Sequence, residues 1–170
     1  ELLARGFDAN TPDERGQLPL FLALRGGAER VAEVLLNDPA TAVDRANVLG
    51  ETALMMAALR GQEGWVRRLV ERGARINRDG WTPLHYAASG PSLDVVRFLV
   101  EHKAVLDARA PNGSTPLMVA AQHGPEDAVW LLVKQGATVG LRDAKGRSAA
   151  DLARLAGRES LAESLDQLKR

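Results

Sequence analysis

A ten-residue pattern recurs five times along this chain, and this recurrence constrains the fold more than any other feature. The copies begin at Leu18, Thr52, Thr82, Thr115 and Ser148, where the sequence reads LPLFLALRGG, TALMMAALRG, TPLHYAASGP, TPLMVAAQHG and SAADLARLAG. A glycine precedes each copy by two residues, and the successive glycines, Gly16, Gly50, Gly80, Gly113 and Gly146, are 34, 30, 33 and 33 residues apart. Because a second apolar stretch follows each copy, the period predicts a solenoid whose units bury their apolar faces against each other.

Each copy also carries the signals of a short helix. Threonine followed by proline, as at Thr82 and Thr115, suits an N-cap with proline in the first helical position, where its missing N–H is harmless. An alanine pair in the middle three copies gives a thin face that lets the next helix approach closely. Pro91 predicts an atypical turn after the third copy. In the other copies a glycine is expected to end the helix in the left-handed conformation, at Gly27, Gly61, Gly124 and Gly157.

The period and the TPLH core resemble the ankyrin-repeat family over essentially the whole chain. The resemblance implies an all-α ankyrin-repeat solenoid of stacked antiparallel helix pairs with protruding hairpin loops. It predicts a single domain, with a partial repeat at 1–15, a repeat at 16–49, a short repeat at 50–79, repeats at 80–112 and 113–145, and a C-terminal cap repeat at 146–170. In the cap, SAAD replaces the tetrapeptide and the second helix turns polar.

Two irregularities interrupt the period. The segment from Gly73 to Gly80, GARINRDG, is three residues shorter than its counterpart from Gly136 to Gly146, so we expect one hairpin to be clipped or missing. The start of the chain, LLARGFDANTPDERG, has the pattern of the end of a second helix and its hairpin. We expect residues to precede Glu1, because such a half repeat would leave apolar side chains uncovered, among them Leu2 and Leu3.

The three histidines do not predict a catalytic or metal site. His85 could act as a ligand or general base, but the other copies place Phe21, Met55, Met118 and Asp151 in its slot. We therefore interpret His85 as scaffold, and the resemblance implies that it bonds within and between repeats. His102 and His123 have no partner at metal-ligand spacing, so His123 is interpreted as a solvated turn residue, with partner contact as the second interpretation. Without a phosphate loop or a nucleophile elbow in the sequence, we expect no enzyme, no metal and no cofactor.

Composition argues against further classes of partner. The formal net charge is zero and aromatic residues make up 4%, so neither a basic field nor a stacking platform indicates nucleic acid. The apolar runs are far shorter than the roughly 20 residues that span a bilayer, so we expect no membrane insertion. Cysteine is absent, which leaves the localisation open between cytoplasm and periplasm, with or without a leader before Glu1. Richness in alanine, leucine, arginine and glycine is typical of a GC-rich bacterial genome.

Arginines and tryptophans mark two candidate surfaces. Arginines cluster between Arg60 and Arg78 and would either steer an acidic partner or form a solvated outer surface. Trp65 is expected on the buried stripe of its helix, and Trp130 partly exposed on the outer surface. Trp81 either forms a binding hot spot or packs against the shortened loop.

We conclude from the sequence that the chain is a non-catalytic scaffold that binds another protein through its concave groove and hairpin tips, as a monomer and without a small-molecule substrate. Alternatives are a regulatory or targeting module of a larger protein, or a self-associating structural element. By family analogy the partner-binding positions are Arg15, Gln17, Arg25, Glu51, Leu59, Arg60, Trp81, Ser89, Asn112, Ser114, Gln122, His123 and Arg147.

Overall fold

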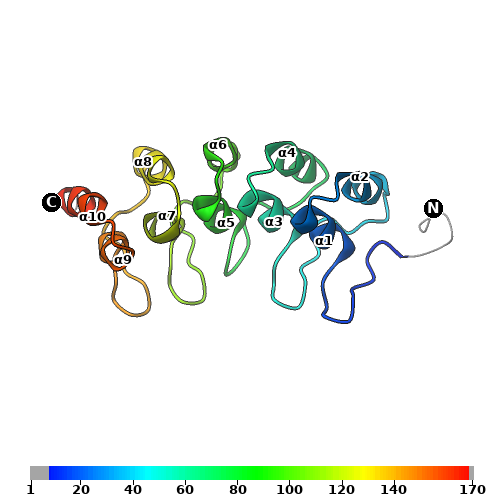
Figure 1. Ribbon diagram of the computed structural model, residues 1–170, viewed down its shortest axis with the longest axis horizontal. Helices are drawn as coiled ribbons and strands as arrows, with labels where there is room; N and C mark the ends of the chain where they lie inside the picture. Colours follow the sequence, from blue (N-terminus) through cyan, green and yellow to red (C-terminus); the bar gives the residue numbers. More distant parts are fainter. Residues whose placement is uncertain (1–7, 169–170) are drawn as a thin grey trace.

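The computed structural model describes residues 8–168, and these residues form ten α-helices and no β-strand. The helices follow one another in antiparallel pairs (Figure 1). Within the described residues, no helix is both long enough and apolar enough to cross a membrane. The bounds are α1 Pro19–Gly26 and α2 Glu29–Asn37, α3 Ala53–Leu59 and α4 Glu63–Glu71, α5 Pro83–Ser89 and α6 Leu93–Glu101, α7 Pro116–His123 and α8 Glu126–Lys134, and α9 Ala149–Leu155 and α10 Glu159–Gln167.

The pairs stack side by side into an elongated, two-layered solenoid. The odd-numbered helices form one layer, the even-numbered helices form the other, and the hairpins project from the odd-numbered layer (Figure 1). Within the array α3, α5, α7 and α9 pack against one another, and α1 packs against α3. The predicted all-α solenoid of helix pairs is confirmed. The start of the chain, with Leu2 and Leu3, lies outside the described residues.

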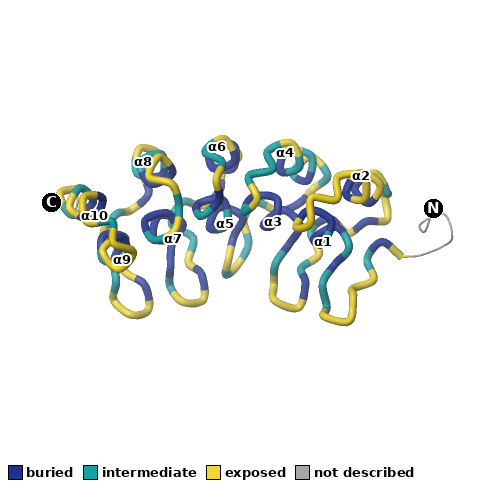
Figure 2. Tube along the Cα trace, in the orientation of Figure 1, coloured by how far each residue is buried: buried dark blue, intermediate teal, exposed yellow. Residues whose placement is uncertain are grey.

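The core runs between the two helix layers and along the stack of odd-numbered helices (Figure 2). The leucine of each TPLH-like tetrapeptide is almost fully buried, as at Leu54, Leu84 and Leu117. The paired alanines are buried as well, so only small methyl groups separate neighbouring helices at these positions. On the even-numbered helices only the inward stripe is buried, while residues such as Arg97 are exposed. Burial on one face of each helix is what an amphipathic repeat requires.

The ends of the odd-numbered helices follow local sequence signals, with one correction. Three N-cap side chains accept the N–H three residues on, at 3.3 Å for Thr52, 3.4 Å for Thr115 and 3.3 Å for Ser148. Gly27, Gly61 and Gly157 take the expected left-handed conformation. The expectation for Gly124 is wrong: its φ is −90°. Pro125 follows it, and the residue before a proline is pushed into extended backbone.

Gly124 is required for a different reason, namely the close approach of two repeats. A Cβ atom at this position would lie 1.9 Å from the carbonyl oxygen of Ala88. Gly90, which precedes Pro91, is likewise extended, with a φ of −80°. The atypical turn predicted at Pro91 is therefore present, and the turn between α7 and α8 shares its extended glycine.

A polar side chain at the base of each internal hairpin links successive repeats. Asn10 accepts the N–H of Ala42, Asp44 that of Arg75, Asn77 that of Val105 and Asp107 that of Thr138, at 2.7 to 3.0 Å. Each of these bonds satisfies a backbone donor that no helix or sheet would pair. The links fix the angle between hairpins and helices along the whole solenoid.

The hairpin between α4 and α5 is shorter than its neighbours, as expected (Figure 1). In the other hairpins a reciprocal pair of backbone bonds closes the tip, for example Ala110 N–H to Ser114 O at 2.9 Å and Gly113 N–H to Ala110 O at 2.8 Å. Within the described chain, residues 75–81 form no such pair. The three missing residues therefore remove the closed tip, while the base of the hairpin stays linked on both sides through Arg75 and Asn77.

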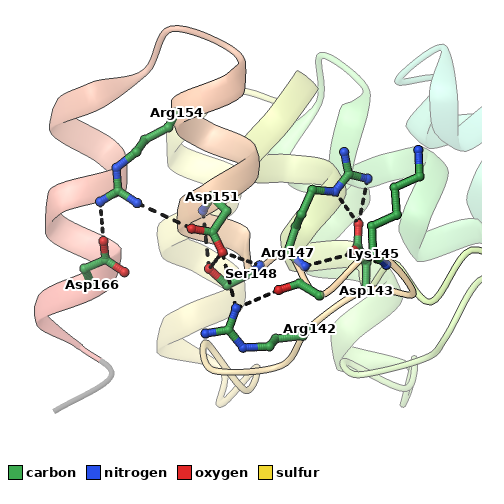
Figure 3. A network of polar contacts seen from close by, with 9 residues as sticks. Arg142, Asp143, Lys145, Arg147, Ser148, Asp151, Arg154 and Asp166 are labelled. Atoms are coloured by element: carbon green, nitrogen blue, oxygen red, sulfur yellow. Dashed lines mark hydrogen bonds and ion pairs between the residues drawn. The ribbon is translucent and has the colours of Figure 1, made fainter.

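The C-terminal repeat ends in a network of charged side chains (Figure 3). Asp151 accepts hydrogen bonds from the N–H and Oγ of Ser148, both at 2.8 Å, and Arg142 and Arg154 lie 3.6 Å from its carboxylate. Arg154 also bonds Asp166 of α10. This network ties α9 to α10 where no further repeat in the described chain covers them.

Candidate protein-binding groove

A cavity of about 380 Å³ opens on the inner face of α5 and α7, beside the hairpins. We call it the groove cavity. Its lining mixes apolar and uncharged polar side chains from the end of α3, from α5 and α7, and from the hairpin residues before these helices. These residues are Leu59, Trp81, His85, Tyr86, Ser89, Asn112, Ser114, Val119, Gln122 and His123.

Trp81 forms the most exposed apolar part of this lining. Its side chain is 37% exposed, and its ring meets His85 and Tyr86 edge-on, with centroid distances of 5.2 and 6.3 Å. The ring is therefore held by its own repeat, and part of it remains open to the groove cavity. An aromatic side chain that is fixed but still exposed loses little entropy when a partner covers it.

His85 packs edge-on against the Trp81 ring and is buried, with 1% of its surface exposed. Its Nδ1 accepts the N–H of Thr82 at 3.1 Å, which leaves Nε2 to donate to the carbonyl oxygen of Ser114 in the next repeat, at 3.0 Å. This geometry requires the neutral ring protonated at Nε2. Burial lowers the pKa of His85, although the carbonyls of Ser114 and Ala108 oppose this shift. The interpretation as scaffold, bonding within and between repeats, agrees with these contacts.

Tyr86 connects the groove cavity to the preceding repeat. Its hydroxyl donates to Glu51 Oε1 at 3.1 Å, and Asn47 donates to the other carboxylate oxygen at 3.0 Å. Burial, followed by the negative charge of Glu51, raises the pKa of the Tyr86 hydroxyl. Glu51 therefore links Asn47 of its own hairpin to Tyr86 of α5 in the next repeat.

The structure brings together part of the surface predicted from the sequence. Seven predicted positions line the groove cavity: Leu59, Trp81, Ser89, Asn112, Ser114, Gln122 and His123. Six lie outside it: Arg15, Gln17, Arg25, Glu51, Arg60 and Arg147. Of these, Gln17 accepts a bond from Asn47, and Arg147 pairs with Asp143 at 2.7 Å.

Three lining residues were missed as groove positions: His85, Tyr86 and Val119. Tyr86 and Val119 stand four residues after the N-cap threonine of their repeats, so the repeat register carried a signal for them. His85 was interpreted as scaffold, and it both supports and lines the cavity.

Three of the six arginines in the cluster between Arg60 and Arg78 pair with carboxylates, two of them with carboxylates of the neighbouring repeat. Arg68 pairs with Glu33 and Arg75 with Asp44, both at 2.5 Å, and Arg67 pairs with Glu63 of its own helix at 2.6 Å. These pairs favour the solvated outer surface over a steering field. Trp65 is only half-buried, with the Arg68 guanidinium 4.8 Å from its ring centre. Trp130 is also partly exposed, as expected, and donates to Glu126 at 3.1 Å.

Chemically, the groove cavity offers an aromatic edge, amides, hydroxyls and one buried neutral imidazole. Among the described residues, no three histidine or acidic side chains gather where they could hold a metal ion. The lining suits an apolar side chain with hydrogen-bonding groups around it, which is how side chains of a partner protein are recognised.

Comparison with known proteins finds a match to one protein family. A family model described as ankyrin repeats in three copies matches residues 1–79 and 76–143. The human ankyrin repeat and SOCS box protein 16 is 36% identical over 153 residues, which cover 88% of this chain and 33% of that protein.

Two further relatives are much longer than the region they share with this chain. Neurogenic locus notch homolog protein 1 from Xenopus tropicalis is 34% identical over 70% of this chain and 5% of its own length. The tyrosine-protein kinase Shark from Drosophila melanogaster is 35% identical over 72% of this chain and 13% of its own length. The chain thus spans a third or less of each relative, and the expected bacterial origin stays a prediction.

Proposed function

Since this chain belongs to the ankyrin-repeat family, we propose that it is a non-catalytic module that binds another protein through the concave face containing the groove cavity. Ankyrin repeats are in general protein–protein interaction modules. The proposal adds the place of binding and its anchor, which is the exposed part of Trp81.

The observation that supports this proposal most is the combination of a shaped cavity with a fixed aromatic ring. Binding energy at protein interfaces concentrates in a few residues, often tryptophan and tyrosine, that lie in pockets from which water is excluded. Trp81 and Tyr86 meet this description, and polar groups such as Asn112 and Gln122 surround them. A partner side chain that covers Trp81 would bury apolar surface and leave those polar groups at the rim.

The test compares Trp81, in the hairpin before α5, with Trp130 on α8 of the even-numbered layer. The wild-type chain, Trp81→Ala and Trp130→Ala would each be immobilised and exposed to lysate of the source cell, and retained proteins identified by mass spectrometry. A retained protein is then purified and its dissociation constant measured against all three chains. We expect Trp81→Ala to weaken binding at least tenfold, while Trp130→Ala, on the outer layer, changes it less than threefold.

Circular dichroism before the binding step shows whether each variant keeps its helices. Equal loss in both tryptophan variants, or full binding by a folded Trp81→Ala chain, would move the interface away from the groove cavity. Replacing Arg60 by alanine in addition to Trp81 extends the test to the neighbouring end of α3.

The larger size of the relatives favours a second candidate, namely a regulatory or targeting module of a longer protein. The relatives include a protein with a SOCS box and a protein named as a tyrosine kinase, and each extends well beyond the shared region. In that case the groove cavity would bind a partner on behalf of other domains. The open reading frame in the source genome distinguishes the two candidates.

A further inference from the structure

The shortened hairpin leaves one arginine without the contacts that its counterparts make. In three other hairpins an arginine donates from Nη1 to backbone carbonyls: Arg45 to Asn10 O at 2.9 Å, Arg109 to Gly113 O at 2.8 Å and Arg142 to Gly146 O at 2.6 Å. The hairpin between α4 and α5 contains two arginines, Arg75, which pairs with Asp44, and Arg78. Nη1 of Arg78 is buried and has no hydrogen-bond acceptor among the described residues.

The shortened tip sets Arg78 apart from Arg109 and Arg142. Arg109 and Arg142 each bond the carbonyl of the glycine four residues on, at the end of a closed hairpin tip. Residues 75–81 form no closed tip, and Gly80 stands only two residues after Arg78, so this hairpin has no glycine carbonyl four residues beyond its guanidinium. A guanidinium N–H that is taken from water without an acceptor is costly, and such groups are rare in folded proteins.

Arg78 lines a second cavity, of about 510 Å³, between this hairpin and the next. We call it the Arg78 cavity. Arg109 also lines it, and the bonds from Arg109 go to the uncharged carbonyls of Gly113 and Arg142, which leave its positive charge unpaired. Asp79 is the single acidic residue in the lining, so the cavity has two positive charges and one negative charge.

The Arg78 cavity lies on the opposite face of the hairpin from the groove cavity. Gly80 and Thr82 line the Arg78 cavity, whereas Trp81 between them lines the groove cavity. Neighbouring residues of extended backbone point to opposite faces, and Thr82 is extended, with φ −113° and ψ 160°. A ligand in one cavity therefore does not compete with a ligand in the other.

We propose that the Arg78 cavity is a binding site for a carboxylate group, carried by an aspartate or glutamate side chain of a protein ligand. The planar guanidinium groups of Arg78 and Arg109 match the two oxygens of a carboxylate, and one negative charge neutralises the excess positive charge of the lining. The site itself is independent of the groove cavity. Only the protein nature of the natural ligand rests on the proposed function.

The probe is N-acetyl-aspartic acid α-amide, with N-acetyl-asparagine amide as its uncharged match. Each is titrated at constant ionic strength while the Nε–Hε signals of Arg78 and Arg109 are followed by NMR. We expect saturable shifts with the aspartate probe and none with the asparagine probe. Arg78→Gln should weaken this binding at least tenfold, and Arg45→Gln, at the matching place in an intact hairpin, should leave it unchanged.

Further arms keep the result decisive. Asp79→Asn should tighten binding, because it removes the negative charge of the cavity without touching either arginine. Trp81→Ala should leave it unchanged, which separates failure of this site from failure of the groove cavity. Three outcomes would each overturn the carboxylate assignment. The asparagine probe could shift the signals as much as the aspartate probe does, or the Arg109 signal could report unaltered binding of the aspartate probe to the Arg78→Gln chain. The third is that inorganic phosphate binds tenfold more tightly than the aspartate probe.

Discussion

Replacing His85 by leucine tests how much the buried imidazole contributes to the stability of the solenoid. Leucine occupies a similar volume and keeps the apolar contact with the Trp81 ring, but it can neither accept nor donate a hydrogen bond. The N–H of Thr82 and the carbonyl of Ser114 would lose their partners, which lie at 3.1 and 3.0 Å in the native chain. Because His85 is almost fully buried, water cannot replace those partners.

The expected magnitude follows from these two groups. A buried polar group left without a partner costs about 1–3 kcal/mol, which gives about 2–6 kcal/mol for the pair. Burial of the more apolar leucine recovers about 1–2 kcal/mol of this amount. At the middle of these ranges, about 4 less about 1.5 kcal/mol, we expect His85→Leu to lower the free energy of unfolding by about 2.5 kcal/mol. For a chain of this length that corresponds to a fall in melting temperature of about 5–10 °C.

The assay is urea unfolding followed by far-ultraviolet circular dichroism, with His102→Leu as the matched control. His102 is exposed, and its Nδ1 bonds only the carbonyl of Phe98 in its own helix, at 2.8 Å. We expect its replacement to cost less than about 1 kcal/mol. If His85→Leu stays within about 0.5 kcal/mol of the wild type, or costs no more than His102→Leu, the inter-repeat role of His85 is refuted.

Three further predictions use the same unfolding assay. Burial lowers the pKa of His85 below 6.5, so the unfolded state binds a proton at a higher pH than the folded state does. The free energy of unfolding should therefore be highest above pH 6.5 and fall below it by up to about 1.4 kcal/mol per pH unit. The His85→Leu chain should lack this pH-dependent loss of stability. Gly124→Ala should destabilise the fold by about 1–3 kcal/mol or more, because the new Cβ would clash with the backbone of the preceding repeat. Gly26→Ala has open space around the new Cβ and should stabilise the fold by about 0.5–1 kcal/mol. Equal effects of the two substitutions would contradict the steric argument. Asp143→Ala should cost about 1.5–3 kcal/mol, since its buried carboxylate accepts two bonds from Arg147, and an unchanged free energy of unfolding would count against it.

The sequence predicted the fold well because the information was repeated. A threonine–proline pair or an alanine pair at one place is weak evidence, but the same features in the same register along the chain are strong evidence for stacked helix pairs. The conformation of Gly124 was mispredicted because its slot was compared with Gly61 and Gly157, and the local effect of Pro125 was not weighed. The period predicts the conformation that the copies share, but not a change that an adjacent residue such as Pro125 causes in one copy.

The site was predictable only as a set of positions. Trp81, Ser89 and Gln122 converge on one cavity because equivalent slots of stacked repeats lie side by side, and the period predicts that. The roles of Glu51 and Arg147 were not predictable, since nothing in the sequence shows that each is held by a side chain of its own hairpin or of a neighbouring repeat. Polar residues on exposed slots can serve either a partner or the scaffold, and only their contacts distinguish the two.

The departures of this surface from a regular array trace back to the three residues missing from one hairpin. Gly50, which faces the shortened hairpin, has nothing within 4 Å of the place where its Cβ would stand, while Gly80 and Gly113 meet the hairpin that follows each of them. In the same shortened hairpin Nη1 of Arg78 is buried without an acceptor among the described residues. The irregularity in the period therefore marks the part of the surface that differs from the other repeats of this chain.

This argument predicts the effect of restoring the hairpin. Replacing Asp79 by Ala-Pro-Asn makes the chain after Arg78 read Ala-Pro-Asn-Gly, as it does after Arg109, and should rebuild a closed turn. Asp79→Asn is the reference for the charge that this replacement removes. A carbonyl would then reach the Arg78 guanidinium, so the lengthened chain should bind N-acetyl-aspartic acid α-amide at least tenfold more weakly than the wild type. An insertion of the same three residues in the hairpin after Lys145 serves as the control for added length. If the lengthened chain folds and still binds the probe with unchanged affinity, the missing residues are not what makes Arg78 available.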